Sequence, residues 1–444
     1  MPTVYRFAAF LACAVVFAAC LLSAPQGIAQ GLLDSPLGEE ELQAKQKAWV
    51  SALVKRRHYA SEDQLLGQLL SVPDVGLDSK TAIELRKTLA SQAFGKESSS
   101  LLDDPAQEHV GLQTLKKLAS KLQQPELVAL PWQPSEAQQL NSSLAKSLQD
   151  TATHLHARLA RLPKSGEKHG DLETLRKKLW GPTADRKWNE PDCIPAITQI
   201  LQAQPTPVRT LLVEQLAKIP GSASSEALAQ RAIYDLSPDI REQAVAALKA
   251  RPTREYQKTL LSGFRWPWRP VTEHSAEAIA ALQLKELAQP LTAMLQEPDP
   301  AIPFEKVENG ERVLYVKELV KMNHVQNCLL CHPPSFRSGD LVRGVVPVPG
   351  SSPRMHSYAS QRFHGQMVQV RADSTTLRQE FSVMHSHGST DGEHATERYD
   401  YFLRERRANA EEIERHEERE KGERPRGLNI EREAVLFALH SIGH

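Results

Sequence analysis

Apolar positions recur at helical spacing over the first third of the chain. In residues 40–57, 80–94, 108–122 and 136–162 they lie three or four positions apart, and proline-containing breaks separate the segments. This spacing places the apolar side chains on one face of an α-helix. The pattern therefore predicts a helical N-terminal region over residues 30–180, with Trp49, Trp132 and Trp180 packed in its core.

Three apolar segments between residues 181 and 300 repeat at an interval of about thirty residues. They start at Val208, Ile240 and Val271, and a proline lies one or two positions before each start. Proline is favoured in the first turn of a helix. Residues 195–201, 225–234, 255–264 and 284–295 provide helical segments between the repeats. A helix pair repeated at this interval cannot bury its apolar face alone, so the pairs are expected to stack into an α-solenoid.

The pattern changes after residue 300. Asn309 and Gly310 predict a turn, and residues 313–325 are expected to form a helix that leads to Cys328. Residues 345–349 and 367–371 have the composition of strands, which predicts an irregular, partly β module over residues 301–402. Residues 403–429 alternate acidic and basic side chains and are read as a solvated helix or spacer, followed by a C-terminal helix in residues 430–444.

Charge and hydropathy limit the classes of partner. Lys and Arg number 54, as do Asp and Glu, so no basic surplus exists to neutralise phosphates. A nucleic-acid partner is therefore not expected. Arg6 followed by the apolar residues 7–22 and then by small residues predicts a signal peptide over residues 1–29. We expect an exported protein of the periplasm or cell envelope, with no membrane span after signal removal. A lipid anchor at Cys20 is a minor alternative.

Residues 328–332 read Cys-Leu-Leu-Cys-His, the spacing at which two thiols attach one c-type haem. Cys328 and Cys331 would bind the porphyrin, and His332 would be the proximal iron ligand. The alternatives are a disulfide between the two thiols or half of a zinc site. The remaining mature cysteine, Cys193, is expected to be a small buried residue.

A sixth iron ligand is not fixed by the spacing. Met384 is the first candidate, because it lies at a distance along the chain that such modules use and follows a Phe-Ser-Val strand. Other donors occur in the same region: Met355, His356, Met367, His385 and His387. The last two, together with His394, are also weighed as a surface metal site.

The sequence from residue 179 to 444 resembles a group of exported bacterial HEAT-repeat proteins that carry a single C-x-x-C-H. The resemblance includes residues 263–268 (Gly-Phe-Arg-Trp-Pro-Trp), 322–335 around the motif, 377–382, 398–401 (Arg-Tyr-Asp-Tyr) and 432–438. It implies HEAT-like repeats over residues 181–300 and a haem-binding module after them, but no reaction. Unlike small cytochromes c, the chain has no Gly and aromatic pair in a short helix just before the first cysteine.

Three function classes remain. The first is a mono-haem protein for electron transfer or redox-linked binding, with a protein partner on the repeat surface. The second is an interaction scaffold in which Cys328 and Cys331 form a structural disulfide. The third is an enzyme with an open iron position, but no catalytic residue can be assigned from the sequence.

Overall fold

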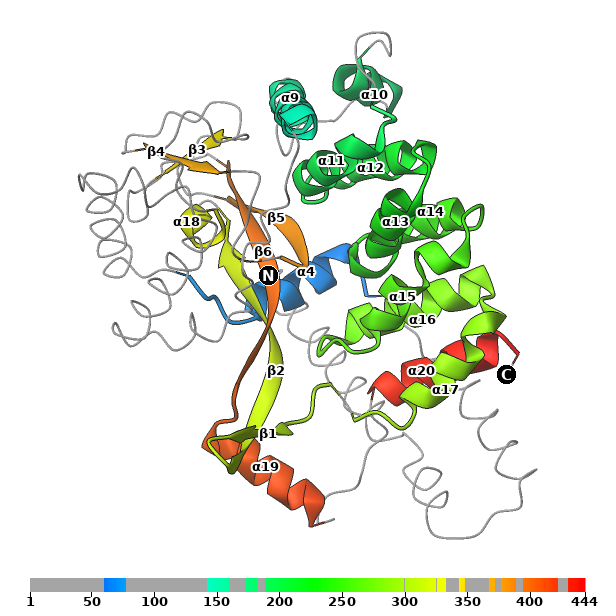
Figure 1. The fold of residues 1–444 in the computed structure, drawn as a ribbon, viewed down its shortest axis with the longest axis vertical. Coiled ribbons are helices and arrows are strands. Elements are labelled where there is room, and N and C mark those ends of the chain that lie inside the picture. Colours follow the sequence, from blue (N-terminus) through cyan, green and yellow to red (C-terminus); the bar gives the residue numbers. More distant parts are fainter. Residues whose placement is uncertain are drawn as a thin grey trace, which may run out of the picture.

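The computed structural model describes residues 60–76, 142–159, 172–181, 188–298, 300–324, 326–332, 343–347, 367–371, 377, 379–388, 394–421 and 430–443. Figure 1 shows a curved stack of helices facing an antiparallel sheet. The mainly α fold class expected from the sequence is confirmed. The predicted signal peptide and the predicted helices at residues 40–57, 80–94 and 108–122, with Trp49 and Trp132, lie outside the described residues.

Three helices are described before the repeats: α4 (Glu62–Ser71), α9 (Ser142–Leu159) and α10 (Leu172–Trp180). Helix α9 lies within the predicted segment 136–162, and α4 lies in the predicted helical region, between the segments 40–57 and 80–94. A capping box starts α4, because the Ser61 hydroxyl accepts from the backbone of Gln64 and the Gln64 side chain accepts from the backbone of Ser61. Trp180 is buried, as expected, and packs edge-on against Trp188 at 5.2 Å between ring centroids.

The repeat segments form seven α-helices: α11 (Ile194–Leu201), α12 (Thr206–Lys218), α13 (Ser222–Tyr234), α14 (Pro238–Leu248), α15 (Gln257–Gly263), α16 (Arg269–Leu282) and α17 (Ala288–Met294). Short 3₁₀ turns precede three of them: η1 (Pro191–Cys193), η2 (Thr253–Glu255) and η3 (Lys285–Leu287). Prolines occupy the first turns of α12, α14 and α16, as predicted. Helix α12 packs on α11 and on α13, α13 packs on α14, and α15 packs on α16. In addition, α12, α14 and α16 pack in succession, as do α11, α13 and α15. The helices therefore form two layers, called the helical array below.

The chain then enters a sheet with the order β1-β2-β6-β5, in which all pairs are antiparallel. Its strands are β1 (Phe304–Glu308), β2 (Glu311–Asn323), β5 (Phe381–Gly388) and β6 (His394–Arg407). A separate antiparallel pair joins β3 (Arg343–Pro347) and β4 (Met367–Arg371). The expected turn at Asn309 and Gly310 is confirmed, since both residues have positive φ, of 52° and 87° and close the hairpin of β1 and β2.

The helix predicted over residues 313–325 is wrong, because these residues lie mainly in β2. The reason is that this part of the sheet is covered on both faces. Leu319 joins the main core against the helical array, whereas Val320 and Met322 join a second apolar cluster. The buried positions Val316, Leu319 and Val320 are thus spaced like the apolar stripe of a helix.

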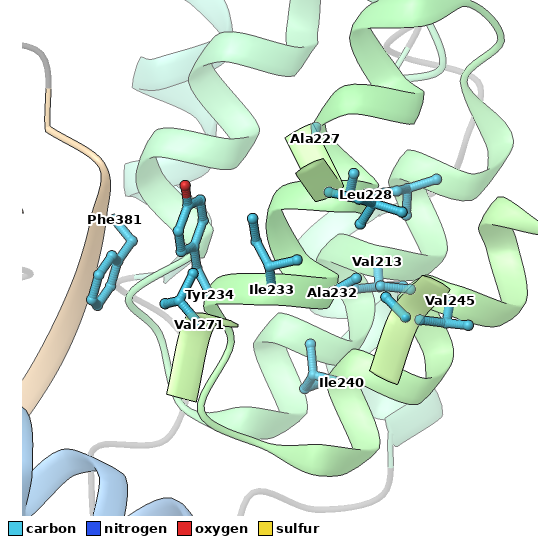
Figure 2. Packing of buried hydrophobic residues seen from close by; sticks show 14 of the residues in the cluster. Val213, Ala227, Leu228, Ala232, Ile233, Tyr234, Ile240, Val245, Val271 and Phe381 are labelled. Atoms are coloured by element: carbon cyan, nitrogen blue, oxygen red, sulfur yellow. The ribbon is translucent and has the colours of Figure 1, made fainter. Parts of the chain in front are cut away.

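One phenyl ring, that of Phe381 in β5, joins the sheet to the helical array. It stacks on Tyr401 of β6 with 4.8 Å between centroids and on Trp268 with 5.9 Å. On the array side it also lies 5.6 Å from Tyr234 and 6.0 Å from Trp266. Figure 2 shows Phe381 reaching from its strand toward Tyr234 beside Val271. All five rings are buried, so this aromatic cluster forms an apolar contact between the two parts.

Two helices follow the sheet, α19 (Ala410–Glu420) and α20 (Ile430–Ser441). The first part of the predicted spacer 403–429 is not a spacer, because β6 continues to Arg407. There, Arg404 and Arg406 pair with Glu318 of β2 at 2.6 and 2.8 Å. Helix α20 packs against α16 and α17 and buries Val435 and Ala438 in the main core, as expected for the amphipathic C-terminal segment.

Within the described ranges, no helix has both the length and the apolar character needed to cross a membrane.

Replacing Phe381 by Ala should lower the free energy of unfolding by about 3–5 kcal/mol, because it empties the space between four other buried rings. Urea denaturation followed by tryptophan fluorescence measures the change, since Trp266 and Trp268 border the ring. Val307→Ala is the control, because this side chain is 74% exposed and its loss should cost less than about 0.5 kcal/mol. Equal stability of the two variants would contradict the assigned role of Phe381.

Candidate functional site

The Cys-Leu-Leu-Cys-His sequence forms a single helical turn directly after β2. Helix α18 (Cys328–Cys331) is closed by a 2.7 Å hydrogen bond from the His332 backbone N–H to the Cys328 carbonyl. Asn323, the last residue of β2, accepts from Gln326 N at 3.2 Å through its side chain and from the Asn327 amide at 2.9 Å through its carbonyl. These bonds fix the turn, called the CxxCH turn below, at the end of the strand.

Neither thiol of the CxxCH turn is in a disulfide, and both are buried: Cys328 is 7% exposed and Cys331 8%. The Cys328 thiol donates to the His324 carbonyl at 3.2 Å. Cys331 belongs to the second apolar cluster, which consists of Val75, Val320, Met322, Leu330, Cys331, Leu377 and Phe402. Burial raises the pKa of Cys328 to about 12 and that of Cys331 well above its ordinary value. Both groups are therefore neutral thiols near pH 7 and weak nucleophiles.

A buried carboxylate, Asp400 of β6, lies beside the CxxCH turn and is 2% exposed. His324 Nδ1 is 2.5 Å from one of its oxygens. The other oxygen accepts from the Ser382 hydroxyl at 2.6 Å and from Arg398 Nε at 3.1 Å. Burial alone would raise the pKa of Asp400, but His324 and Arg398 outweigh this effect and hold the pKa well below its usual range. Asp400 is thus an ionised group inside the protein, and these four residues are called the Asp400 network.

The Asp400 network extends to the helical array. Arg398 also donates to the carbonyl of Gln199 in α11 at 3.1 Å and to the Ser382 hydroxyl at 2.9 Å. The side-chain amides of Gln199 and Gln379 are 2.7 Å apart, with Gln379 also 3.2 Å from Ser382. A continuous polar path therefore runs from α11 through two strands to His324, four residues before Cys328.

Met384, the candidate sixth ligand, lies in β5 opposite Arg398. The backbone N–H of His324 donates to the Arg398 carbonyl at 2.9 Å, so Met384 occupies the same cross-strand row as His324, two strands away. Its role as a ligand remains a prediction. His385 lies opposite Glu397. Met355 and His356, and the side chains of Met367, His387 and His394, fall outside the described residues.

No cluster of three or more His, Cys, Asp or Glu side chains suited to a metal ion is found in the described part of the chain. Cys193 is a small buried residue, as expected, with its Sγ 3.7 Å from the Thr151 hydroxyl. His324 and Asp400 were not found by sequence reasoning. A sequence signal for Asp400 did exist: charged and aromatic residues alternate from Arg398 to Tyr401. In a strand, this alternation places Arg398 and Asp400 on the same face.

No protein-family model, curated protein or solved structure matches this chain. The functional proposal therefore rests on the residues of the CxxCH turn and its surroundings.

Asp400→Asn should lower the free energy of unfolding at pH 7 by roughly 3–5 kcal/mol, because Arg398 is then buried without its carboxylate. A depressed folded-state pKa stabilises the protein above the unfolded-state value of about 3.9, and this contribution is lost as the pH falls below it. The wild type should therefore lose stability more steeply than the variant as the pH falls below about 4, as measured by urea denaturation.

Glu405→Gln is the matched control for the loss of one negative charge. Glu405 pairs with Lys306 on the surface, where both side chains are about two-fifths exposed, so this change should cost less than about 1 kcal/mol. Parallel acid profiles for the wild type and Asp400→Asn would rule out an ionised Asp400 in the folded protein.

Proposed function

We propose that this protein is an exported HEAT-like α-solenoid protein that carries one covalent c-type haem on Cys328, Cys331 and His332. It acts in one-electron transfer or in redox-linked binding of a protein partner. The observation that carries the proposal is the CxxCH turn itself, in which two thiols and an imidazole are presented within one helical turn.

The donor set and its surroundings fit this cofactor. Side chains three positions apart on a helix lie on the same side, so Cys328 and Cys331 are placed to bond one macrocycle. His332 follows at once and is half-buried. The neighbours of Cys331 are apolar, among them Val320, Leu330 and Phe402, and such an environment suits an apolar porphyrin and limits its contact with water.

When bound, the haem supplies a one-electron couple. His332 is assigned as the proximal ligand and Met384 as a candidate for the distal position. The potential of such a group depends on burial and on nearby charges. The Asp400 network provides fixed charges beside the turn, with the ionised carboxylate paired to Arg398. These residues of the chain would therefore set the electrostatic environment of the cofactor.

The α-solenoid assignment is supported by the layered packing of α11 to α16. In one layer α12, α14 and α16 pack in succession, and in the other α11, α13 and α15 do so. Stacked helix pairs present an extended surface typical of protein-binding repeat proteins. We therefore assign the partner-binding role to the helical array and the redox role to the module that follows it.

A disulfide-stabilised interaction scaffold is the alternative. Cys328 and Cys331 lie on the same helical turn, and a bond between them would replace two buried thiols. A thiolate-dependent enzyme is disfavoured by the raised pKa values of both cysteines.

The variant in which both Cys328 and Cys331 are replaced by Ala should lose covalent haem completely when it is produced in a host with c-type maturation machinery. Intact mass and the Soret band after denaturation measure attachment. Cys193→Ala is the control and should keep the haem, because Cys193 packs against Thr151 in another part of the core. A wild-type mass lower by two hydrogens, without haem, would instead support the disulfide scaffold.

Met384→Ala should keep the covalent haem but change the axial-ligand features of its visible spectrum and lower its reduction potential, because a thioether ligand raises the potential. A potentiometric titration measures the shift. An unchanged spectrum and potential would remove Met384 from the iron site.

A further inference from the structure

One segment, residues 60–76, connects the helical array to the CxxCH turn. In Figure 1 helix α4 lies between the sheet and the array, and the blue chain that leaves it continues past β2. We call this segment, which includes α4 and the five residues 72–76 that follow it, the strap.

The first half of the strap is anchored to the helical array. Glu62 accepts hydrogen bonds from Arg209 Nη2 and from the Thr206 hydroxyl, the latter at 3.1 Å. Gln68 accepts from Trp268 Nε1 at 3.3 Å. On the same helix, Leu65 and Leu69 are buried in the main core.

The second half of the strap pairs with β2 beyond the end of β1, which covers only residues 311–315 of that strand. The Lys321 N–H donates to the Pro73 carbonyl at 2.9 Å, and the Val75 N–H donates to the Lys321 carbonyl at 2.8 Å. Val75, which is 2% exposed, belongs to the same apolar cluster as Cys331. A Cβ on Gly76 would lie 3.1 Å from the Asn327 amide nitrogen. The strap therefore packs directly on the turn that carries the thiols.

We propose that the strap controls access to the thiols of the CxxCH turn: docked, it seals the cluster around Cys331, and released, it opens this cluster to reagents and to an incoming cofactor. On undocking, Arg209 would keep its buried partner Asp235, which lies 2.9 Å away. The Glu62 side chain is 37% exposed, so this anchor is within reach of solvent and of a competing acidic group.

Helix α4 has ten residues, and an isolated helix of that length is unstable in water. Release of the strap therefore unfolds α4. A substitution that raises the helical propensity of α4 should then lower the accessibility of the thiols, and one that reduces this propensity should raise it. The inference concerns the same turn as the proposed function, but the reactivity of the thiols can be measured without haem. The two proposals can therefore fail separately.

The test is the alkylation rate of each cysteine in the full-length mature chain, produced without haem and treated with iodoacetamide under reducing conditions. Peptide mass spectrometry assigns the rates. Glu62→Gln should label Cys331 roughly tenfold faster than the wild type, because it weakens hydrogen bonds to a charged group. Asp63→Asn is the matched control, since it removes one negative charge from the same helical turn at an exposed position, and it should label at the wild-type rate.

A second variant acts in the opposite direction. A Cβ at Gly67 would meet no atom within 4 Å, so Gly67→Ala should stabilise the docked helix and slow Cys331 labelling about two- to fivefold. Cys193 is the internal standard for global opening and should label at one rate in all four proteins.

The proposal is overturned if Glu62→Gln and Asp63→Asn label Cys331 at equal rates, or if Gly67→Ala leaves the rate unchanged. It is also overturned if Cys193 accelerates together with Cys331, because the thiols then become exposed by general unfolding. A failure of haem attachment in the maturation host would leave these rates untouched and would count against the proposed function alone.

Discussion

The burial of the Asp400 carboxylate is the constraint on which the arrangement of this protein depends. An ionised group removed from water is stable only when partners surround it, and here the partners come from separate parts of the chain. Ser382 lies in β5, Arg398 in β6, and His324 after β2. Arg398 in turn requires the Gln199 carbonyl of α11. The charge is therefore satisfied only when sheet, CxxCH turn and helical array are assembled together, which links the geometry of the CxxCH turn to the position of the array.

The sequence predicted those features that depend on local chemistry. The prolines in the first turns of α12, α14 and α16 and the Asn309-Gly310 turn carry their own conformational signals. Strand β2 was missed because its pairing with Tyr399 and other residues of β6 is remote in sequence, and its burial on two faces imitates a helical stripe. The two thiols and His332 could be picked out as candidate site residues from their spacing in the sequence. The residues of the Asp400 network lie up to 76 positions apart, so they can be grouped only once the pairing of the strands is known.

The burial of the two thiols implies that the proposed cofactor site has an open state, in which the cofactor attaches, and a closed state, in which water is excluded. The folded protein holds Cys328 and Cys331 as neutral, enclosed groups, which protects them from oxidation but also from any bonding partner. A site that must acquire a large ligand and afterwards exclude water needs a part that closes last. The apolar cluster around Cys331 meets this requirement, because its members come from several segments, including Val75 of the strap and Phe402 of β6.

The C-terminal helix α20 has a consequence for how the chain is made. It covers α16 and α17, the last helices of the array, although the whole sheet intervenes between them in sequence. During synthesis, the N-terminal parts of a chain fold first, so the apolar side of α16 and α17 stays uncovered until residues 430–441 have left the ribosome. A chain that stops before Ile430 would leave this apolar side exposed and would be prone to associate with other chains.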